Sequence, residues 1–426
     1  MPASAATSKA KQQVGLLGAV AIGLASMLGA GIFTVFREAF AKTYSYLAVA
    51  LFLAGLVACL NAASVYSMAK QIDRPGGVYA YSRHYLNKDF SFVAGFAFVF
   101  GKIGSIGAIA WIFAEYLTPL SNGALNTQLV ASLAILVLTL LNTLGINRTA
   151  LVAAILAAIT TTYLVVAGLL GASHRGSGSN FTNLLSGGHS GGILAAASLL
   201  FFAFAGYARV ATLGNEVKNA KVNIPRAILI SLSAVLALYL LLGYALVNSL
   251  GTELDHLDAP FVAMLLGAGD LIPAWVTVLV ASAASLGSML ALLAGVSRTA
   301  ATMAEDRELP SAFAHRNRFG SPWLAEVIIA AGSIALLWSN AYLQWVIGFS
   351  SFSVLLYYAI GHLSALRQPR AEKPLPRIVA ILGFALCVAL LLSVPGPAVG
   401  VSCGILVIAL VLRRMTRGLA NTARGE

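Results

Sequence analysis

The stretch LGAGIF at residues 28–33 interrupts an apolar run that extends from residue 14 to residue 36. A second stretch, FAGYA at residues 204–208, interrupts another apolar run near its middle. Small residues at these two points favour breaks in membrane helices, because non-helical backbone at membrane depth is tolerated only where protein or a cavity covers it. Freed amides at the N-terminus of a half-helix favour an anionic group, so we expect a carboxylate at the first break.

Taken alone, Gly-x-Gly is more often a packing surface between membrane helices than a ligand site. The positions of the two breaks reverse this preference. Five predicted spans begin with the first break and five with the second, and an odd number of spans per repeat means that the second copy enters the membrane from the opposite side. This pattern predicts an inverted repeat whose broken helices meet at the midplane and form a substrate site.

Composition excludes a soluble protein. Hydrophobic residues make up 59% of the 426 residues and charged residues only 10%, whereas a soluble surface needs about a quarter of the residues charged. With about 20 apolar residues per spanning helix, we predict an all-α membrane protein. Its twelve predicted transmembrane helices are 14–36, 44–69, 90–119, 126–145, 149–171, 192–213, 225–250, 272–302, 322–339, 342–366, 376–394 and 396–413.

The predicted organisation is two five-helix repeats with two further helices. The first repeat is residues 14–171, the second is residues 192–367, and residues 376–413 form helices 11 and 12. The remaining segments, 1–13 and 414–426, are predicted tails. Of the 27 Lys and Arg residues, 22 fall on the side of the tails and 3 on the other side. Positive charge marks the cytoplasmic side, so we expect both termini in the cytoplasm and the chain in the plasma (inner) membrane.

The same charge distribution accounts for the net charge of +12 without nucleic acid. The three cysteines lie in apolar runs and show no metal-ligand spacing. The six histidines show no paired spacing and are assigned to loops or span ends. Because the predicted spans offer no set of nucleophiles, metal ligands or paired carboxylates, and no phosphate-binding loop is present, we expect no enzyme, no metal site and no cofactor.

Lys102 lies near the middle of the third predicted span, and intramembrane ionisable residues are functional candidates by default. We hypothesise that Lys102 gains and loses a proton during transport, or that it takes the place of a sodium ion and points at carbonyls of a broken helix. Ser285 and Ser288 of the eighth span are candidate oxygen donors at this coupling site. The equally weighted alternative is a permanently charged lysine that braces helix ends.

Arg209 follows the second break and stays protonated, so it cannot carry a proton. A snorkelling or helix-capping role is favoured over substrate contact. Two cations without a mid-membrane acid disfavour cationic substrates, and we therefore expect a neutral or acidic substrate.

Several motifs resemble the amino acid–polyamine–organocation superfamily of permeases. They are LGAGIF at 28–33, RPGGVYAY at 74–81, FAFAGY at 202–207, NEVKN at 215–219 with IPRA at 224–227, and the eighth-span exit with Arg298, Asp306, Leu309-Pro310 and Gly320-Ser321-Pro322. The likeness covers nearly the whole chain. It implies a leucine-transporter-like fold of five plus five inverted spans, with helices 1 and 6 broken and two helices appended. It also implies secondary active transport of amino acids by alternating access.

The resemblance also implies the substrate-binding residues. Backbone at Ala30, Gly31 and Ile32 would hold the substrate carboxylate, carbonyls near Phe202, Ala205 and Gly206 would hold its amino group, and Phe202 and Tyr207 would wall the pocket. One departure matters: many members have Glu where this chain has Ala208. A coupling role of that Glu is therefore in doubt here, and a proton is the candidate coupling ion.

The alternatives are an exchanger or exporter, and a transport-inactive sensor that keeps the permease fold. The expected partners are a small-molecule amino acid and membrane lipids, and nucleic acid is not among them. The sequence leaves open which amino acid is carried, the direction of transport and the oligomeric state.

Overall fold

The computed structural model describes residues 14–422 apart from residues 30, 73, 75, 118–125, 145, 175–189, 208–209, 211–216, 258, 270 and 340. For residues 34, 146–150, 153 and 416–422 it describes the backbone alone. The described part is helical, with one isolated bridge in which Val14 pairs in parallel with Val217.

The principal helices follow one another along the whole chain. They are α1 (Leu16–Met27), α2 (Gly31–Thr43), α3 (Leu47–Ala69), α4 (Val78–Tyr85), α5 (Lys88–Leu117), α6 (Thr127–Thr143), α7 (Ile146–Ser173), α9 (Ile193–Phe204), η4 (Ala205–Tyr207), α11 (Ala220–Leu250), α12 (Pro260–Gly267), α13 (Ala274–Glu305), α14 (Trp323–Trp338), α15 (Leu343–Arg367), α16 (Arg377–Leu392) and α17 (Gly396–Thr422).

Among the described residues, nine helical segments are long and apolar enough to cross a membrane. Three further apolar helices, α6, α14 and α16, have 17, 16 and 16 residues. The all-α membrane fold is thereby confirmed, while the count of twelve spanning helices stays a prediction.

Local sequence signals fix several helix starts. The Asn126 side chain accepts a hydrogen bond from the Leu129 amide and caps α6. Asn87 accepts from the amides of Asp89 and Phe90, both at 2.9 Å, at the start of α5. Proline precedes α13, α14 and α16, where its missing N–H removes no helical hydrogen bond.

The structure differs from the predicted elements in two ways. The predicted loops at 70–89 and 251–271 contain the short helices α4 and α12, which sequence periodicity does not reveal because they are only eight residues long. Helix α17 also continues beyond the predicted span 396–413 to Thr422, and the predicted tail from residue 414 stays a prediction. The N-terminal tail, residues 1–13, lies outside the described residues.

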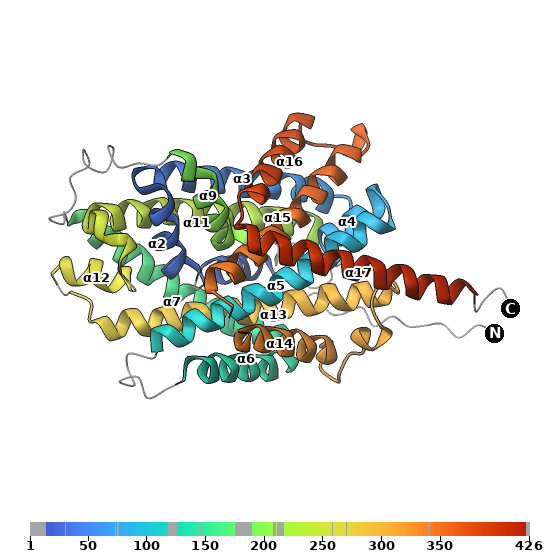
Figure 1. Ribbon diagram of the computed structural model, residues 1–426, viewed down its shortest axis with the longest axis horizontal. Helices are drawn as coiled ribbons and strands as arrows, with labels where there is room; N and C mark the ends of the chain where they lie inside the picture. Colours follow the sequence, from blue (N-terminus) through green and yellow to red (C-terminus); the bar gives the residue numbers. More distant parts are fainter. Residues whose placement is uncertain are drawn as a thin grey trace.

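The long helices run roughly alongside one another, with α4 and the last turns of α17 at one end of the bundle and α12 at the opposite end (Figure 1). We name these the α4 end and the α12 end. Helix α5 packs against α13 and α15, α1 packs against α7 and α11, and α9 packs against α2 and α3. The breaks between α1 and α2 and after α9 therefore lie inside the bundle.

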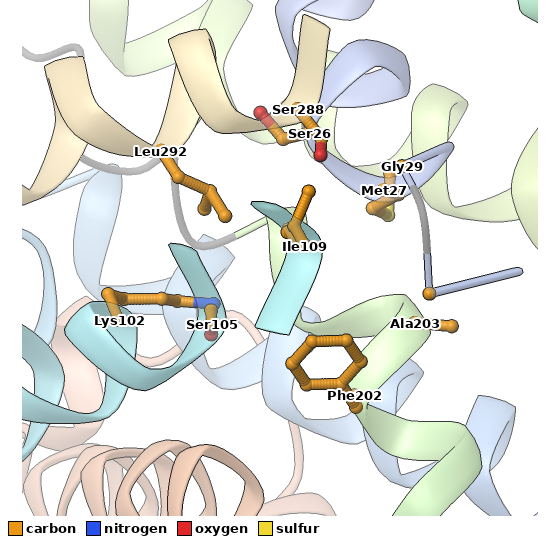
Figure 2. A pocket seen from close by; sticks show the side chains of 12 residues that line it. Ser26, Met27, Gly29, Lys102, Ser105, Ile109, Phe202, Ala203, Ser288 and Leu292 are labelled. Carbon is orange, nitrogen blue, oxygen red and sulfur yellow. The ribbon is translucent and has the colours of Figure 1, made fainter. Parts of the chain in front are cut away.

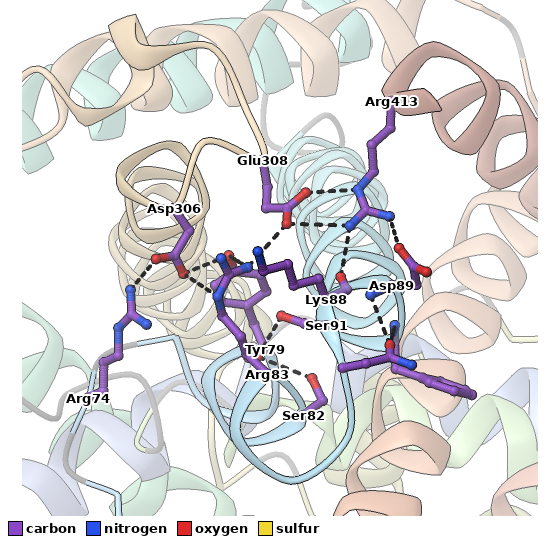
Figure 3. A network of polar contacts seen from close by, with 12 residues as sticks. Arg74, Tyr79, Ser82, Arg83, Lys88, Asp89, Ser91, Asp306, Glu308 and Arg413 are labelled. Carbon is purple, nitrogen blue, oxygen red and sulfur yellow. Dashed lines mark hydrogen bonds and ion pairs between the residues drawn. The ribbon is translucent and has the colours of Figure 1, made fainter. Parts of the chain in front are cut away.

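A charged network ties helices together at the α4 end (Figure 3). The fully buried Glu308 side chain pairs with Arg83 Nη1 at 3.1 Å and with Arg413 Nε at 2.8 Å. Arg413 also pairs with Asp89 at 2.5 Å. The segment after α13 is thus joined to α4 and to the last helix, α17, and α17 is joined in turn to the beginning of α5.

Asp306 extends this network. Its carboxylate pairs with Arg74 at 2.5 Å and accepts a hydrogen bond from the Tyr79 hydroxyl at 2.8 Å. Burial, and then the hydrogen bond to Asp306, raise the pKa of Tyr79 well above its usual range. The Tyr79 phenol therefore keeps its proton at physiological pH and remains a hydrogen-bond donor to Asp306.

Candidate functional site

The first break separates α1, which ends at Met27, from α2, which begins at Gly31. Its two glycines lie against other helices. A Cβ at Gly29 would collide with the Ser288 hydroxyl, and one at Gly31 would lie 3.2 Å from the ring of Phe202. Glycine thus lets the broken segment approach α13 and α9 with no side chain between them.

The second break follows α9, which ends at Phe204 and passes into the 3₁₀ turn η4. A Cβ at Gly206 would collide with the backbone carbonyl of Ser26, in the last turn of α1. The two breaks therefore touch through their main chains. Because of this main-chain contact, the two breaks form one feature of the structure and are more than a surface of small residues where helices pack.

Tyr239 of α11 links the two half-helices. Its hydroxyl lies 2.7 Å from the Met27 carbonyl oxygen and 3.2 Å from that of Ala203, so one donor serves the C-terminal end of α1 and of α9. Carbonyls at helix ends have no partner within the helix. The tyrosine therefore satisfies groups that both breaks leave free.

A pocket lies between the breaks and two other helices (Figure 2). The pocket is small and partly open. Its lining comprises Ser26, Met27, Gly29 and Gly31 from the first break, Phe202, Ala203 and Gly206 from α9 and the second break, Lys102, Ser105 and Ile109 from α5, and Ser288 and Leu292 from α13.

Lys102 is the one charged side chain among these lining residues. It is 2% exposed, and its Nζ donates a hydrogen bond to the Ala205 carbonyl at 3.1 Å. This carbonyl belongs to the C-terminal cap of α9, where the helix dipole is negative and favours a cation. Lys102 therefore points at a carbonyl of a broken helix, which is one of the two arrangements predicted for it.

Three of the predicted substrate residues, Gly31, Phe202 and Gly206, line the pocket. Ala30 lies outside the described residues, as does Arg209. The Ile32 side chain is fully buried, and its amide donates to the Gly29 carbonyl at 3.3 Å.

Two predicted site residues have other contacts. The carbonyl of Ala205 accepts the hydrogen bond from Lys102. Tyr207 does not wall the pocket; its ring stacks on Tyr358 with centroids 5.1 Å apart. Tyr207 lies in the turn η4, whose geometry differs from that of the α-helix, so sequence spacing on a continuous helix cannot anticipate the direction of its side chain.

The two predicted serines of α13 donate to carbonyls of their own helix. Ser285 donates to Ala281 at 2.7 Å and Ser288 to Ser285 at 3.2 Å. Ser288 lines the pocket and Ser285 does not. A shared site of Lys102 with both serines stays a prediction.

Sequence reasoning missed Tyr239, Ser26 and Ser105. Ser105 lies 2.5 Å from Ser350 of α15, oxygen to oxygen, and Ser26 donates to its own helix at Ile22. Single hydroxyls within apolar spans were the available signal, but many such residues face neighbouring helices without a ligand.

We expect Tyr239→Phe to lower substrate uptake by about tenfold with little loss of folded protein. The substitution keeps the ring and leaves buried carbonyls of α1 and α9 without their donor, at a cost of about 1–3 kcal/mol. Uptake into proteoliposomes and thermal unfolding in detergent measure the two effects. Tyr244→Phe, which alters an exposed tyrosine on the same helix, is the control. Uptake by Tyr239→Phe at the unmodified rate would contradict the expectation.

Comparison with known proteins agrees with this geometry. The sequence matches the amino acid permease family over residues 14–412. The chain belongs to this family. It is 38% identical to the uncharacterized transporter Rv1999c of Mycobacterium tuberculosis, over 98% of this chain and 94% of that protein. It is also 26% identical to the serine/threonine exchanger SteT of Bacillus subtilis, over 88% of this chain and 89% of SteT. A vacuolar cationic amino acid transporter of Arabidopsis thaliana is 28% identical over 69% of this permease and 52% of its own length.

Solved structures support the fold. The permease is similar to MhsT in complex with L-phenylalanine, with a TM-score of 0.62 and 16% identity over 88% of this chain and 97% of that one. It is also similar to a Na⁺-coupled sialic acid symporter, with a TM-score of 0.58 and 13% identity over 91% of this chain and 90% of that one. These likenesses confirm the leucine-transporter-like fold. The permease is thus a multi-pass membrane transporter of amino acids and not an enzyme.

Proposed function

We propose that this permease takes up a small neutral or acidic amino acid across the plasma membrane by alternating access, together with a proton. The α4 end faces the cytoplasm in this proposal, because the Lys and Arg asymmetry favours that side. Both termini are then cytoplasmic.

The substrate carboxylate binds at the N-terminus of α2, where Gly31 lines the pocket and a helix N-terminus favours an anion. In this proposal backbone at Ala30 and Ile32 also contacts the carboxylate, and the Ile32 amide exchanges its hydrogen bond with the Gly29 carbonyl for one with the substrate. The amino group binds at the C-terminal end of α9, where backbone carbonyls near Phe202 and Gly206 offer partial negative charge.

The observation that carries the proposal is the hydrogen bond from Lys102 to Ala205, at the second break and in the wall of the pocket. A protonated Lys102 holds the C-terminal end of α9 as a bound sodium ion would. Loss of the proton turns this charge-assisted hydrogen bond into a weaker neutral one and so loosens the break. The charge also disfavours a cationic substrate in the same pocket.

The test is uptake by the purified permease in proteoliposomes that are offered a panel of amino acids, with and without a pH gradient. We expect accumulation of small neutral or acidic amino acids to rise at least fivefold when the outside is more acidic. We expect arginine to compete at least tenfold less well than alanine. Equal competition by arginine would reject the charge selectivity, and accumulation independent of the gradient would reject proton coupling.

Lys102→Met tests the role of the lysine in the same assay. The substitution removes the titrating group while keeping an unbranched apolar side chain. We expect the pH gradient to lose its effect on uptake, whereas Lys221→Met, at an exposed position of α11, retains it. A Lys102→Met permease with unaltered pH dependence would reject the proton role.

Exchange is the second candidate, because SteT, a serine/threonine exchanger by name, matches 88% of this chain. An exchanger requires substrate on the far side of the membrane. Uptake that occurs only into vesicles preloaded with amino acid would favour exchange over net uptake.

A further inference from the structure

A line of buried polar side chains runs between α3 and α15, from the second break toward the α4 end. On α3 the residues recur at spacings of three or four and share one helix face. We call the set the polar seam; it consists of the buried Asn61, Ser64 and Ser67 of α3, Tyr358 and His362 of α15, and Gln368 directly after α15, and it ends at the exposed Gln71 just after α3. His362 lies near the end of α15, as predicted, and is nevertheless 0% exposed.

His362 is the centre of the seam. Its Nδ1 lies 2.8 Å from Ser64 Oγ, and its Nε2 lies 2.7 Å from Asn61 Oδ1. An amide oxygen only accepts, so Nε2 carries a hydrogen in this arrangement. The Ser64 hydroxyl can donate to a bare Nδ1 or accept from a protonated one. Both partners therefore suit neutral and protonated imidazole without movement of a heavy atom.

On the side of the α4 end, the seam reaches solvent. Ser67 Oγ donates to Gln368 Oε1 at 2.6 Å, and Gln368 Nε2 donates to the Glu372 carbonyl at 3.1 Å. The exposed Gln71 donates to the same carbonyl at 3.3 Å. One helical turn of α3 separates Ser67 from Ser64, a gap that a water molecule can bridge.

On the other side, the seam ends at the second break. Two buried polar atoms of the seam, Asn61 Nδ2 and the Tyr358 hydroxyl, face the hydroxyl of the adjoining Tyr207, and none of the three makes a hydrogen bond of regular geometry among the described residues. Tyr207 directly follows Gly206 and stacks on Tyr358. Buried polar groups without partners are costly and are commonly satisfied by internal water. We therefore expect water at this point.

The described side chains that form hydrogen bonds with His362, Ser64 and Asn61, carry no charge. The titratable side chains packed in this region are Cys387 of α16, Tyr207 of η4, Tyr81 of α4, and Tyr357 and Tyr358 of α15 itself. All of these are uncharged types at neutral pH. Helix α5 also packs on α15, and its Lys102 donates a hydrogen bond to the Ala205 carbonyl beside the pocket.

A polar cluster that merely joins helices needs no ionisable member, whereas chains of ionisable residues inside membranes serve proton transfer. We propose that the polar seam conducts protons from the second break to the cytoplasm, with His362 as the group that carries them. The imidazole takes a proton at Nδ1, the nitrogen that carries no hydrogen, when the ring turns from Ser64 toward water at the break. After the ring has turned back, Nδ1 passes the proton to the Ser64 hydroxyl, which gives its own hydrogen to water on the α4 side. This inference rests on the proton coupling proposed above.

The experiment measures substrate-driven proton movement and substrate exchange in the same proteoliposomes, using a pH-sensitive dye in the lumen and labelled amino acid. His362→Gln keeps a donor and an acceptor but cannot bind a proton. We expect its exchange rate to stay within threefold of the unmodified permease while proton movement per substrate falls at least tenfold. His315→Gln, at an exposed position between α13 and α14, is the matched control.

Ser64→Ala gives an independent variant, since it removes one partner of the imidazole and leaves the ring in place. We expect proton movement to fall by at least threefold with exchange retained. If His362→Gln moves protons as fast as the unmodified permease does, the proposed role of the polar seam is overturned, and the proposed proton coupling is not. If both variants lose substrate exchange, the polar seam is needed for the structure of the permease, and its proposed role in proton conduction is overturned as well. Absence of proton movement in the unmodified permease would instead overturn the proposed coupling, and the seam with it.

Discussion

Gly206→Ala is expected to lower transport by about a hundredfold or more. The added Cβ would occupy the position of the Ser26 backbone carbonyl, and no side-chain rotation relieves a collision with backbone. The second break must then move away from α1, and displacements of about 1 Å in a positioned site cost roughly that factor. Initial rates of uptake, with substrate binding measured in detergent, show the effect.

Gly404→Ala is the matched control, because a Cβ at this position of α17 meets no atom within 4 Å. It should transport at the unmodified rate. Monodisperse Gly206→Ala protein that binds and transports substrate normally would mean that the two breaks do not need their main-chain contact.

Glu308→Gln is expected to produce the largest loss of stability. The carboxylate is fully buried between Arg83 and Arg413, and its removal leaves two guanidinium groups without their shared partner. Breaking a buried ion pair costs about 3–5 kcal/mol. In a chain of this size we expect the unfolding midpoint to fall by about 3–10 °C, since the shift per kcal/mol decreases with chain length.

The control is Glu305→Gln, which breaks the exposed ion pair between Glu305 and Arg316. Exposed pairs contribute about 0–1 kcal/mol, so its midpoint should change by no more than about 2 °C. Equal midpoints for the two variants would show that the network around Glu308 does not hold the α4 end together.

Much of the fold could be predicted from the sequence, because the bilayer imposes a length on every apolar run and small residues mark where a run breaks. The helix bounds of α5, for example, agree with the prediction within two residues. The short helices α4 and α12 could not be predicted in this way, since eight residues carry too little periodicity.

The candidate site was predicted less completely. Gly31, Phe202 and Gly206 were predicted as site residues from the motifs at the two breaks, and all three line the pocket. Tyr207 is not among the lining residues and stacks on Tyr358 instead, because the direction of a side chain after a break depends on the turn that follows. His362 was dismissed by its position near a span end, yet α3 and α16 cover it completely.

The sequence by itself determined that this chain crosses a membrane as helices, that two of these helices are interrupted, and that a lysine lies at membrane depth. Those properties depend on composition and spacing along one segment, which a bilayer converts directly into structure. Only the tertiary structure decided that Lys102 meets the end of α9, that Tyr239 joins the two breaks and that Asn61 and His362 face one another. Such contacts depend on how each helix is rotated about its axis, and that rotation is fixed by packing between segments far apart in the chain.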